Sequence, residues 1–206
     1  MLNYATTHPE AAMFALARFR SAAAPALRPV RRGLGSAGRL RRKGRFFRDG
    51  IEGICMELRG TIDCGPILRE FGAHVGEGTT IYGPLHVMNA DGDFSNLWIG
   101  DRVYLGTNIL IDLADRVRIG HDVSIGMRSN LITSFDVGPG PLSVKRPRQQ
   151  GPITIEDGAY LGTATTVLHG VTVGAEATVG AHCLVRKAVP AHGTFVSPEG
   201  HLEDAS

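Results

Sequence analysis

An aliphatic residue recurs at every sixth position through much of the second half of the sequence. The longest unbroken run contains six such anchors: Ile155, Leu161, Val167, Val173, Val179 and Val185. Shorter runs lie upstream at Ile99, Leu105 and Ile111, then at Ile119, Ile125 and Leu131, with a fainter start at Val75 and Ile81. This spacing fits neither the period of a helix nor uninterrupted strand alternation. It predicts short strands separated by turns, three of which close one triangular coil of a solenoid.

The anchors and the residues two places before them are expected to fill the narrow interior of these coils. In the longest run the preceding residues are all small or β-branched: Ile153, Ala159, Thr165, Val171, Ala177 and Cys183. A core of this kind explains why aromatic residues make up only 6% of the chain. Glycine follows half of the six anchors, and we expect it to adopt positive φ in the turns.

The aliphatic–glycine hexapeptide pattern resembles that of the hexapeptide-repeat acyltransferases, over roughly residues 72–190. The resemblance implies an all-β fold, a left-handed parallel β-helix; the hand comes from the resemblance alone. It also implies a homotrimer with sites between subunits and acyl-CoA as the co-substrate. The implied reaction moves an acetyl or other short acyl group to a hydroxyl or amine of a sugar, glycan or secondary metabolite.

The repeat register divides the chain into three parts. Residues 1–50 are expected to form a basic arm, helical over residues 9–20, with 11 Lys and Arg against two acidic residues. Residues 51–190 are expected to form the β-helix domain, and residues 191–206 a tail. The largest register break, residues 133–151, is rich in proline, glycine and basic residues, so we expect a loop that projects from the coils. In the resembling family such a loop reaches over a neighbouring subunit.

The positive charge of residues 18–48 favours contact with an anionic membrane surface or an acidic acyl-carrier protein. An arm that wraps the first coil or a trimer partner is the alternative. No nucleic-acid-binding motif accompanies the charge, so no such partner is expected. The sequence contains neither a run of eighteen apolar residues nor a convincing signal peptide. We therefore expect a cytoplasmic protein, with membrane association through the arm as an option.

Acyl transfer from a thioester needs a base, donors for the oxyanion and a slot for the pantetheine arm. In many members of the resembling family the base is a histidine at the start of the extruded loop, in a segment of the form T-H-x-D. The corresponding residues here are Thr133, Ser134, Phe135 and Asp136. The aspartate matches, but Ser134 stands in the place of the histidine. The base must then come from elsewhere, or the chemistry is altered.

Two histidines are candidate bases. The segment from Ile119 to Gly126 resembles the A-H-D-x-[ST]-[IV]-G segment of the lipid A UDP-N-acetylglucosamine acyltransferases, in which the histidine is the base, so His121 is the first candidate. His86, just before a shorter register break at residues 88–96, is the second. Asp122 or Asp136 would orient the imidazole. The alternative for His121 is a turn position that accepts histidine as it accepts aspartate or asparagine.

The resemblance also implies a position for CoA. Family members bind pantetheine along the C-terminal coils, where Gly162, Thr163, Gly180 and Ala181 offer backbone groups. Arg186 and Lys187 align with the T-K of the family's V-x-T-K-D-V-P ending and are expected to contact phosphates; solvated surface charge is the alternative.

Two further features of the sequence bear on the function. The family's A-G-x-P-A segment is missing beyond Pro190, where the chain reads TFVSPEG. A zinc-binding pattern around His169 lacks its second histidine, because that position is Ala164, so no metal is expected. Two rival functions follow: a repurposed family member that uses a carrier-protein donor or another reaction, and a non-catalytic trimeric scaffold.

Overall fold

The computed structural model describes residues 28–197, with side chains from residue 37 onward. The chain divides into two compact units after Phe47. The described part of the first unit belongs to α2 (Arg28–Leu58), a helix interrupted at Gly50, where φ is 64°. The basic stretch after residue 28 is therefore helical. The helix expected over residues 9–20 lies outside the described residues.

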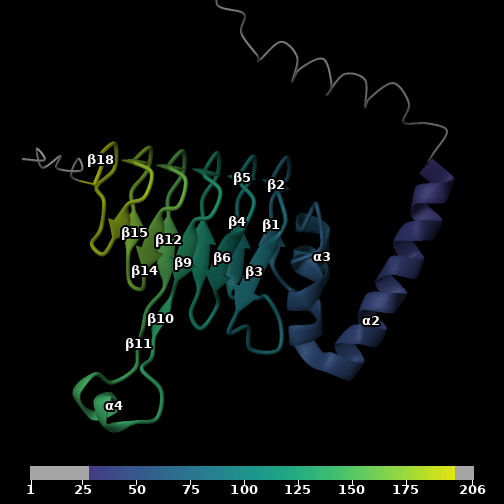
Figure 1. Cartoon of the computed structure of the whole chain (residues 1–206). Coiled ribbons are helices and arrows are strands. Elements are labelled where there is room, and N and C mark those ends of the chain that lie inside the picture. Colours follow the sequence, from purple (N-terminus) through teal and green to yellow (C-terminus); the bar gives the residue numbers. More distant parts are fainter. Residues whose placement is uncertain (1–27, 198–206) are drawn as a thin grey trace, which may run out of the picture. The chain divides into compact units, whose positions relative to one another are not determined.

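The second unit contains a parallel β-helix with three sheet faces (Figure 1). Within each face, every strand pairs in parallel with its neighbours in the adjacent coils, and the strands at the two ends pair on one side only. Face I consists of β1 (His74–Val75), β4 (Leu97–Ile99), β7 (Val117–Ile119), β12 (Ile153–Ile155) and β15 (Thr172–Val173). Face II consists of β2 (Thr80–Ile81), β5 (Tyr104–Leu105), β8 (Ser124–Ile125), β13 (Tyr160–Leu161), β16 (Thr178–Val179) and β18 (Thr194–Phe195). Face III consists of β3 (Leu85–Met88), β6 (Ile109–Asp112), β9 (Asn130–Ile132), β14 (Thr166–Leu168) and β17 (Leu184–Val185).

The interior of the β-helix contains the side chains that the six-residue spacing predicted. All six anchors of the longest run are fully buried, as are the anchors of the two upstream runs from Ile99 and Ile119. Anchors of adjacent coils pair directly, so that Ile155 lies against Ile119 and Val173. Burial of each such aliphatic side chain contributes about 1.5–3 kcal/mol. The prediction of the fold and of its core is confirmed.

The turns differ from the expectation for glycine. Positive φ falls on the third residue after an anchor, as at Arg102, Asn108 and Asp122, and not on the glycine that follows the anchor. That glycine is required for a different reason. A Cβ at Gly126 would lie 2.5 Å from the amide nitrogen of Thr163 in the next coil, so a side chain would force the coils apart.

Helical segments pack against the first coil. The C-terminal part of α2 and the short helix α3 (Gly65–Glu70) bury Ile54, Leu58 and Leu68 in the same hydrophobic core as the anchors. Residues 51–70 of the expected β-helix domain are thus largely helical. At the other end, β18 pairs with β16, so the parallel pairing continues beyond residue 190.

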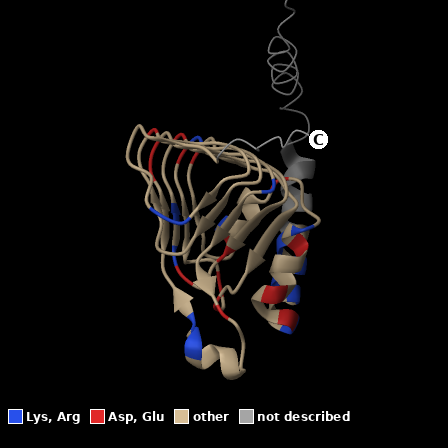
Figure 2. Ribbon diagram, turned by 60° about the vertical axis from the view of Figure 1, so that its left-hand side comes forward, with Lys and Arg blue, Asp and Glu red and all other residues tan. Residues whose placement is uncertain are grey.

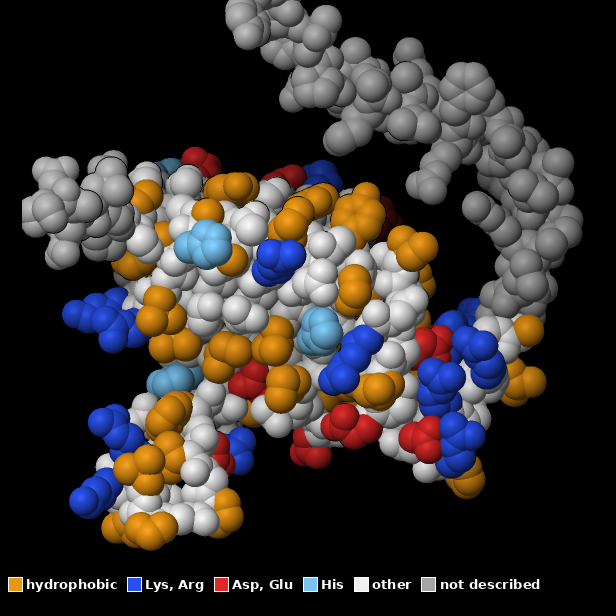
Figure 3. Space-filling model, viewed as in Figure 1, with side chains coloured by type: hydrophobic (Ala, Val, Ile, Leu, Met, Phe, Trp, Pro, Cys, Tyr) orange, Lys and Arg blue, Asp and Glu red, His pale blue; other side chains and the backbone are white. Residues whose placement is uncertain are grey.

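The expected extruded loop projects from the coils between β9 and β12 (Figure 1). Its stem is an antiparallel pair, β10 (Ser134–Phe135) with β11 (Gln149–Gln150), and its tip contains the short helix α4 (Pro141–Lys145). Exposed apolar and basic side chains share this tip, among them Val144 and Lys145 (Figure 3).

Two further properties concern the described residues as a whole. None of their helices combines the length and apolarity needed to cross a bilayer. The three cysteines, Cys55, Cys64 and Cys183, are all buried and free. Burial raises the pKa of the Cys55 thiol to about 11 and that of Cys64 to about 12.

Candidate functional site

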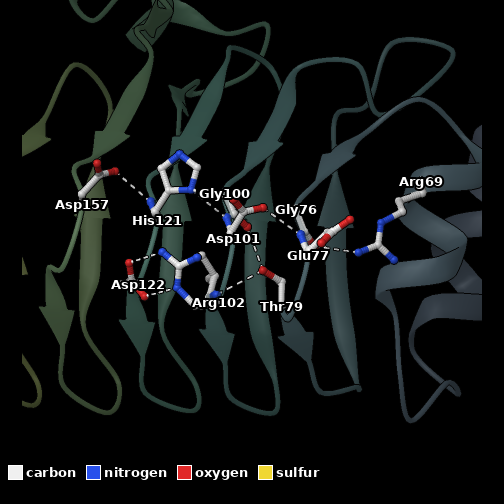
Figure 4. A network of polar contacts seen from close by, with 11 residues as sticks. Arg69, Gly76, Glu77, Thr79, Gly100, Asp101, Arg102, His121, Asp122 and Asp157 are labelled. Carbon is white, nitrogen blue, oxygen red and sulfur yellow. Dashed lines mark hydrogen bonds and ion pairs between the residues drawn. The ribbon is translucent and has the colours of Figure 1, made fainter.

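The corner between faces I and II is closed by a ladder of side chains (Figure 4). At this corner a side chain of the next coil caps the amide of the second residue after three of the anchors, Val75, Ile99 and Ile119. The Asp101 carboxylate accepts the amide of Glu77 at 2.8 Å, and the Asp157 carboxylate accepts that of His121 at 2.8 Å. Between them, Nδ1 of His121 accepts the amide of Asp101 at 3.1 Å. His121 therefore occupies a capping position that aspartate fills in the neighbouring coils.

The environment of His121 differs in one respect from the sequence-based prediction. The carboxylate beside it belongs to Asp101, whose Oδ2 lies 3.3 Å from Nδ1. Asp122 instead forms a two-pronged ion pair with Arg102, which lowers the pKa of that carboxyl. When Nδ1 accepts the Asp101 amide, the ring proton of a neutral His121 sits on Nε2, which then cannot accept a proton from a substrate.

The equivalent corner between faces II and III is open. There the same turn position is occupied by Thr107, Met127, Thr163 and Ala181. Within the described residues, the amides of these four residues have no hydrogen-bond partner. Thr163 and Ala181 thus offer the backbone donors that the sequence predicted for CoA.

The two predicted glycines at this corner serve the coil packing. The amide of Gly162 donates to the Val179 carbonyl and that of Gly180 to the Phe195 carbonyl, each at 2.8 Å, so neither is available to a ligand. A Cβ on Gly162 would lie 2.5 Å from the Ala181 amide nitrogen.

Face III lies between the open corner and the extruded loop. Its outward row runs from His86 through Leu110, Asn130 and Thr166 to Leu184. His86 is partly exposed. Neither of its ring nitrogens has a hydrogen-bond or ion-pair partner in the described part of the chain. Of the two candidate bases, His86 is the one whose nitrogens are both available.

A buried aspartate that the sequence reasoning missed anchors the base of the loop. Asp112, at the end of β6, is only 4% exposed. Its carboxylate accepts hydrogen bonds from Asn89 and Ser134, both at 2.7 Å, and from the Ala114 amide at 3.1 Å. Burial by itself would raise the pKa of Asp112, but these hydrogen bonds together lower it. A polar residue directly after an anchor, where most coils have glycine, was the available signal.

The remaining predicted residues lie around this face. Ser134 donates to Asp112 at the loop stem, whereas Asp136 accepts the Gly138 amide at 2.7 Å and, among the described residues, forms no ion pair with either candidate histidine. Arg186 and Lys187 are exposed just after β17, at the corner between faces III and I. The predicted residues thus form two groups: one borders face III, and the other, His121 with Asp122, lies at the closed corner. The described residues contain no group of three potential metal ligands.

Comparisons with known proteins give a consistent picture. No known family profile matches the sequence. Serine acetyltransferase 4 of Arabidopsis thaliana is 36% identical over 88 residues, which cover 43% of this chain and 24% of the relative. Galactoside O-acetyltransferase of Escherichia coli is 27% identical over 124 residues, covering 60% of this chain and 59% of the relative. Among solved structures, a hexapeptide-repeat acetyltransferase of Vibrio cholerae superposes with a TM-score of 0.60 at 23% identity, over 69% of this chain and 80% of that one.

The coils of this chain are similar to those of hexapeptide-repeat acetyltransferases. Its fold is the left-handed β-helix that the resemblance implied. The Vibrio enzyme is also known in a complex with acetyl-CoA. The chain spans less than two thirds of the length of the curated relatives that it matches.

Proposed function

We propose that this chain is a CoA-dependent acyltransferase that moves an acetyl or other short acyl group to a hydroxyl or amine of a sugar, glycan or secondary metabolite. The observation that carries the proposal is a row of amides at the II–III corner with no hydrogen-bond partner among residues 28–197. This row lies beside a face that presents His86 and borders the extruded loop. The acetyltransferase relatives support the reaction class.

The open corner suits the acyl donor. Pantetheine contains two amide groups whose carbonyl oxygens need N–H donors, and the Thr163 and Ala181 amides provide donors in adjacent coils. Arg186 and Lys187 lie on the opposite border of the same face, where they can contact the phosphates of CoA. The thioester itself supplies the activated acyl carbon.

The geometry favours His86 over His121 as the general base. His86 would take the proton from the acceptor hydroxyl or amine as the acceptor attacks the thioester carbonyl, and would return it to the departing CoA thiolate. Ser134 stands at the loop stem, where many relatives have a histidine, and its hydroxyl donates to Asp112. We assign Ser134 and Asp112 to holding the loop in place rather than to proton transfer.

We further propose a homotrimer with each site between two subunits. The extruded loop projects beyond its own coils, so it can cover the open face of a neighbour (Figure 1). This arrangement would exclude water from the thioester, which a single open face cannot do.

The test is an acetyl-CoA thiol-release assay with a panel of sugars, amino sugars and aminoglycosides, together with calorimetric titration of CoA. The wild type should bind CoA and acetylate at least one acceptor. His86→Ala should lower kcat by about 10²–10⁴-fold, while His121→Asn, the matched control, should keep most of it. If CoA does not bind at millimolar concentration, the scaffold alternative replaces this proposal. If only carrier-bound acyl groups react, the carrier-protein alternative does.

A further inference from the structure

Face I carries a cavity that the proposed reaction does not use. It has a volume of about 320 Å³ and lies across β4, β7 and β12, next to the point where the extruded loop rejoins the coils. Its polar wall is made by Asn96, Arg116, Arg118 and Thr154, and Trp98 and Pro152 provide apolar surface. The volume lies at the small end of the range for ligand pockets and suits a molecule of about one sugar ring.

The strand register brings these side chains together. Trp98, Arg118 and Thr154 are direct partners in neighbouring coils and point outward from the same row. The Val117 amide donates to the Asn96 carbonyl, and the Ile153 amide donates to the Arg116 carbonyl. Arg116 and Arg118 flank the buried Val117, so strand alternation places both on the outer side of the face.

Trp98 holds Arg118 in place. The indole stacks on the ring of His74, with the ring centres 5.0 Å apart and the planes inclined by 6°. The Arg118 guanidinium lies 4.1 Å from the centre of the indole ring. This cation–π contact limits the freedom of a long side chain, so less entropy is lost when its N–H groups bind a ligand.

Neither arginine of the cavity has an acidic partner within the described residues. Other arginines of the chain are neutralised: Arg102 pairs with Asp122 at 2.6 Å, and Arg48 pairs with Asp49 at 2.8 Å. No aspartate or glutamate lines this cavity. These two guanidinium groups, of Arg118 in β7 and of Arg116 just before it, provide several N–H donors for the oxygens of a single anion.

We propose that this cavity binds the oxyanion of a small ligand, a carboxylate or phosphate carried by a molecule of about monosaccharide size. Arg116 and Arg118 bind the oxygens, and the Trp98 edge contacts the carbon skeleton. The site goes beyond the proposed acyl transfer and does not depend on it.

Trp98 is the only tryptophan of the chain, so it reports on the cavity directly. The full-length protein is titrated at constant ionic strength with glucuronate, glucose 6-phosphate and inorganic phosphate, with glucose as the neutral control. A saturable change in tryptophan fluorescence with at least one anion, absent with glucose, is expected. A response to glucuronate alone identifies a carboxylate ligand, and a response to the phosphates alone identifies a phosphate ligand.

Calorimetry on variants then localises the binding. Arg116→Gln and Arg118→Gln should each weaken binding about tenfold, whereas Arg59→Gln, which removes an exposed charge elsewhere, should not. Unchanged affinity in both cavity variants, or no saturable response to any anion, overturns the proposal. Titration of CoA in the same samples keeps the two proposals separate, because either ligand can bind without the other.

Discussion

Asp112 joins three segments that are separate in the sequence: the turn after β3, the end of β6 and the stem of the extruded loop. Asp112→Ala would leave the Asn89 amide and the Ser134 hydroxyl without their acceptor. We expect a loss of about 1–3 kcal/mol in unfolding free energy, and faster proteolysis within residues 136–148. Asp112→Asn keeps one acceptor oxygen, so its unfolding free energy should lie between those of the wild type and the alanine variant. Equal urea midpoints for the alanine variant and the wild type would contradict this role.

The same carboxylate predicts an acid response. Its folded-state pKa is lowered from 3.8, so its contribution to stability is present above that value and is lost as the pH falls below it, through the lowered pKa. The loop stem of the wild type should therefore loosen only in acid below about pH 4. In Asp112→Asn this part of the pH dependence should disappear.

The presence of histidine at position 121 is explained by its capping of the Asp101 amide rather than by its charge. His121→Ala removes the acceptor of the Asp101 amide, which should cost about 0.5–1.5 kcal/mol. His121→Asp or His121→Asn should restore most of that stability, because aspartate has this role at 101 and 157. Thermal melting and acyl transfer are measured on the same samples. Activity lost in all three variants, with stability restored in two, would make His121 the catalytic base after all.

A substitution at Gly162 tests whether the close spacing of the coils restricts the position after an anchor to glycine. A methyl group there would meet the Ala181 amide, so Gly162→Ala should destabilise the protein by about 1–3 kcal/mol. Gly140, in the extruded loop, has no atom within 4 Å of a built Cβ and an extended backbone, so Gly140→Ala is the matched control. Equal denaturant midpoints for the two variants would refute the packing explanation.

At the scale of the elements, the strands were predictable because each one exposes and buries alternate residues. Val117, Arg118 and Ile119 show this in three positions: buried, exposed, buried. The segment of residues 51–70 lacks that alternation, and its apolar residues at 51, 54, 55 and 58 have helical spacing.

The site was harder to predict, because an amide is capped or free according to a side chain in the next coil. The sequence alone does not reveal that Asp101 caps one corner and that nothing in the described residues caps Thr163.

The basic helix is the element for which membrane contact remains a prediction. Over the described length of α2, Lys and Arg side chains are frequent and acidic residues occur only from Asp49 onward (Figure 2). Exposed Leu40 and Phe47 lie among them. We expect sedimentation with phosphatidylglycerol vesicles but not with phosphatidylcholine vesicles, weakened by salt.

Each charge near the surface contributes about 1 kcal/mol to such binding. The triple variant Arg39→Gln, Arg41→Gln, Lys43→Gln should therefore bind anionic vesicles far more weakly than the wild type. Undiminished binding of this variant would show that the described part of α2 is not the contact. If the wild type binds an acidic carrier protein and not the vesicles, the carrier-protein alternative is favoured.

At the scale of the whole β-helix, its chemical groups are distributed unevenly. The I–II corner is closed by carboxylates and an imidazole, whereas the II–III corner and face III leave amides and His86 open. The amides and the imidazole left open on one chain either bind water or form a site together with residues of another copy. The extruded loop is attached at the border of face III opposite the II–III corner, and it is long enough to contribute to a site on another copy.

A mixture of two inactive variants tests whether the sites are shared. The wild type should elute with three times the chain mass of 22.0 kDa. His86→Ala removes the proposed base, and Ala181→Trp blocks the proposed pantetheine corner. Neither should be active alone. If the two groups of one site come from different subunits, trimers reassembled from an equal mixture should regain about a quarter of the wild-type activity, because one combination in four pairs two intact halves. A site built within one subunit would regain none, since each chain in the mixture carries one of the two lesions.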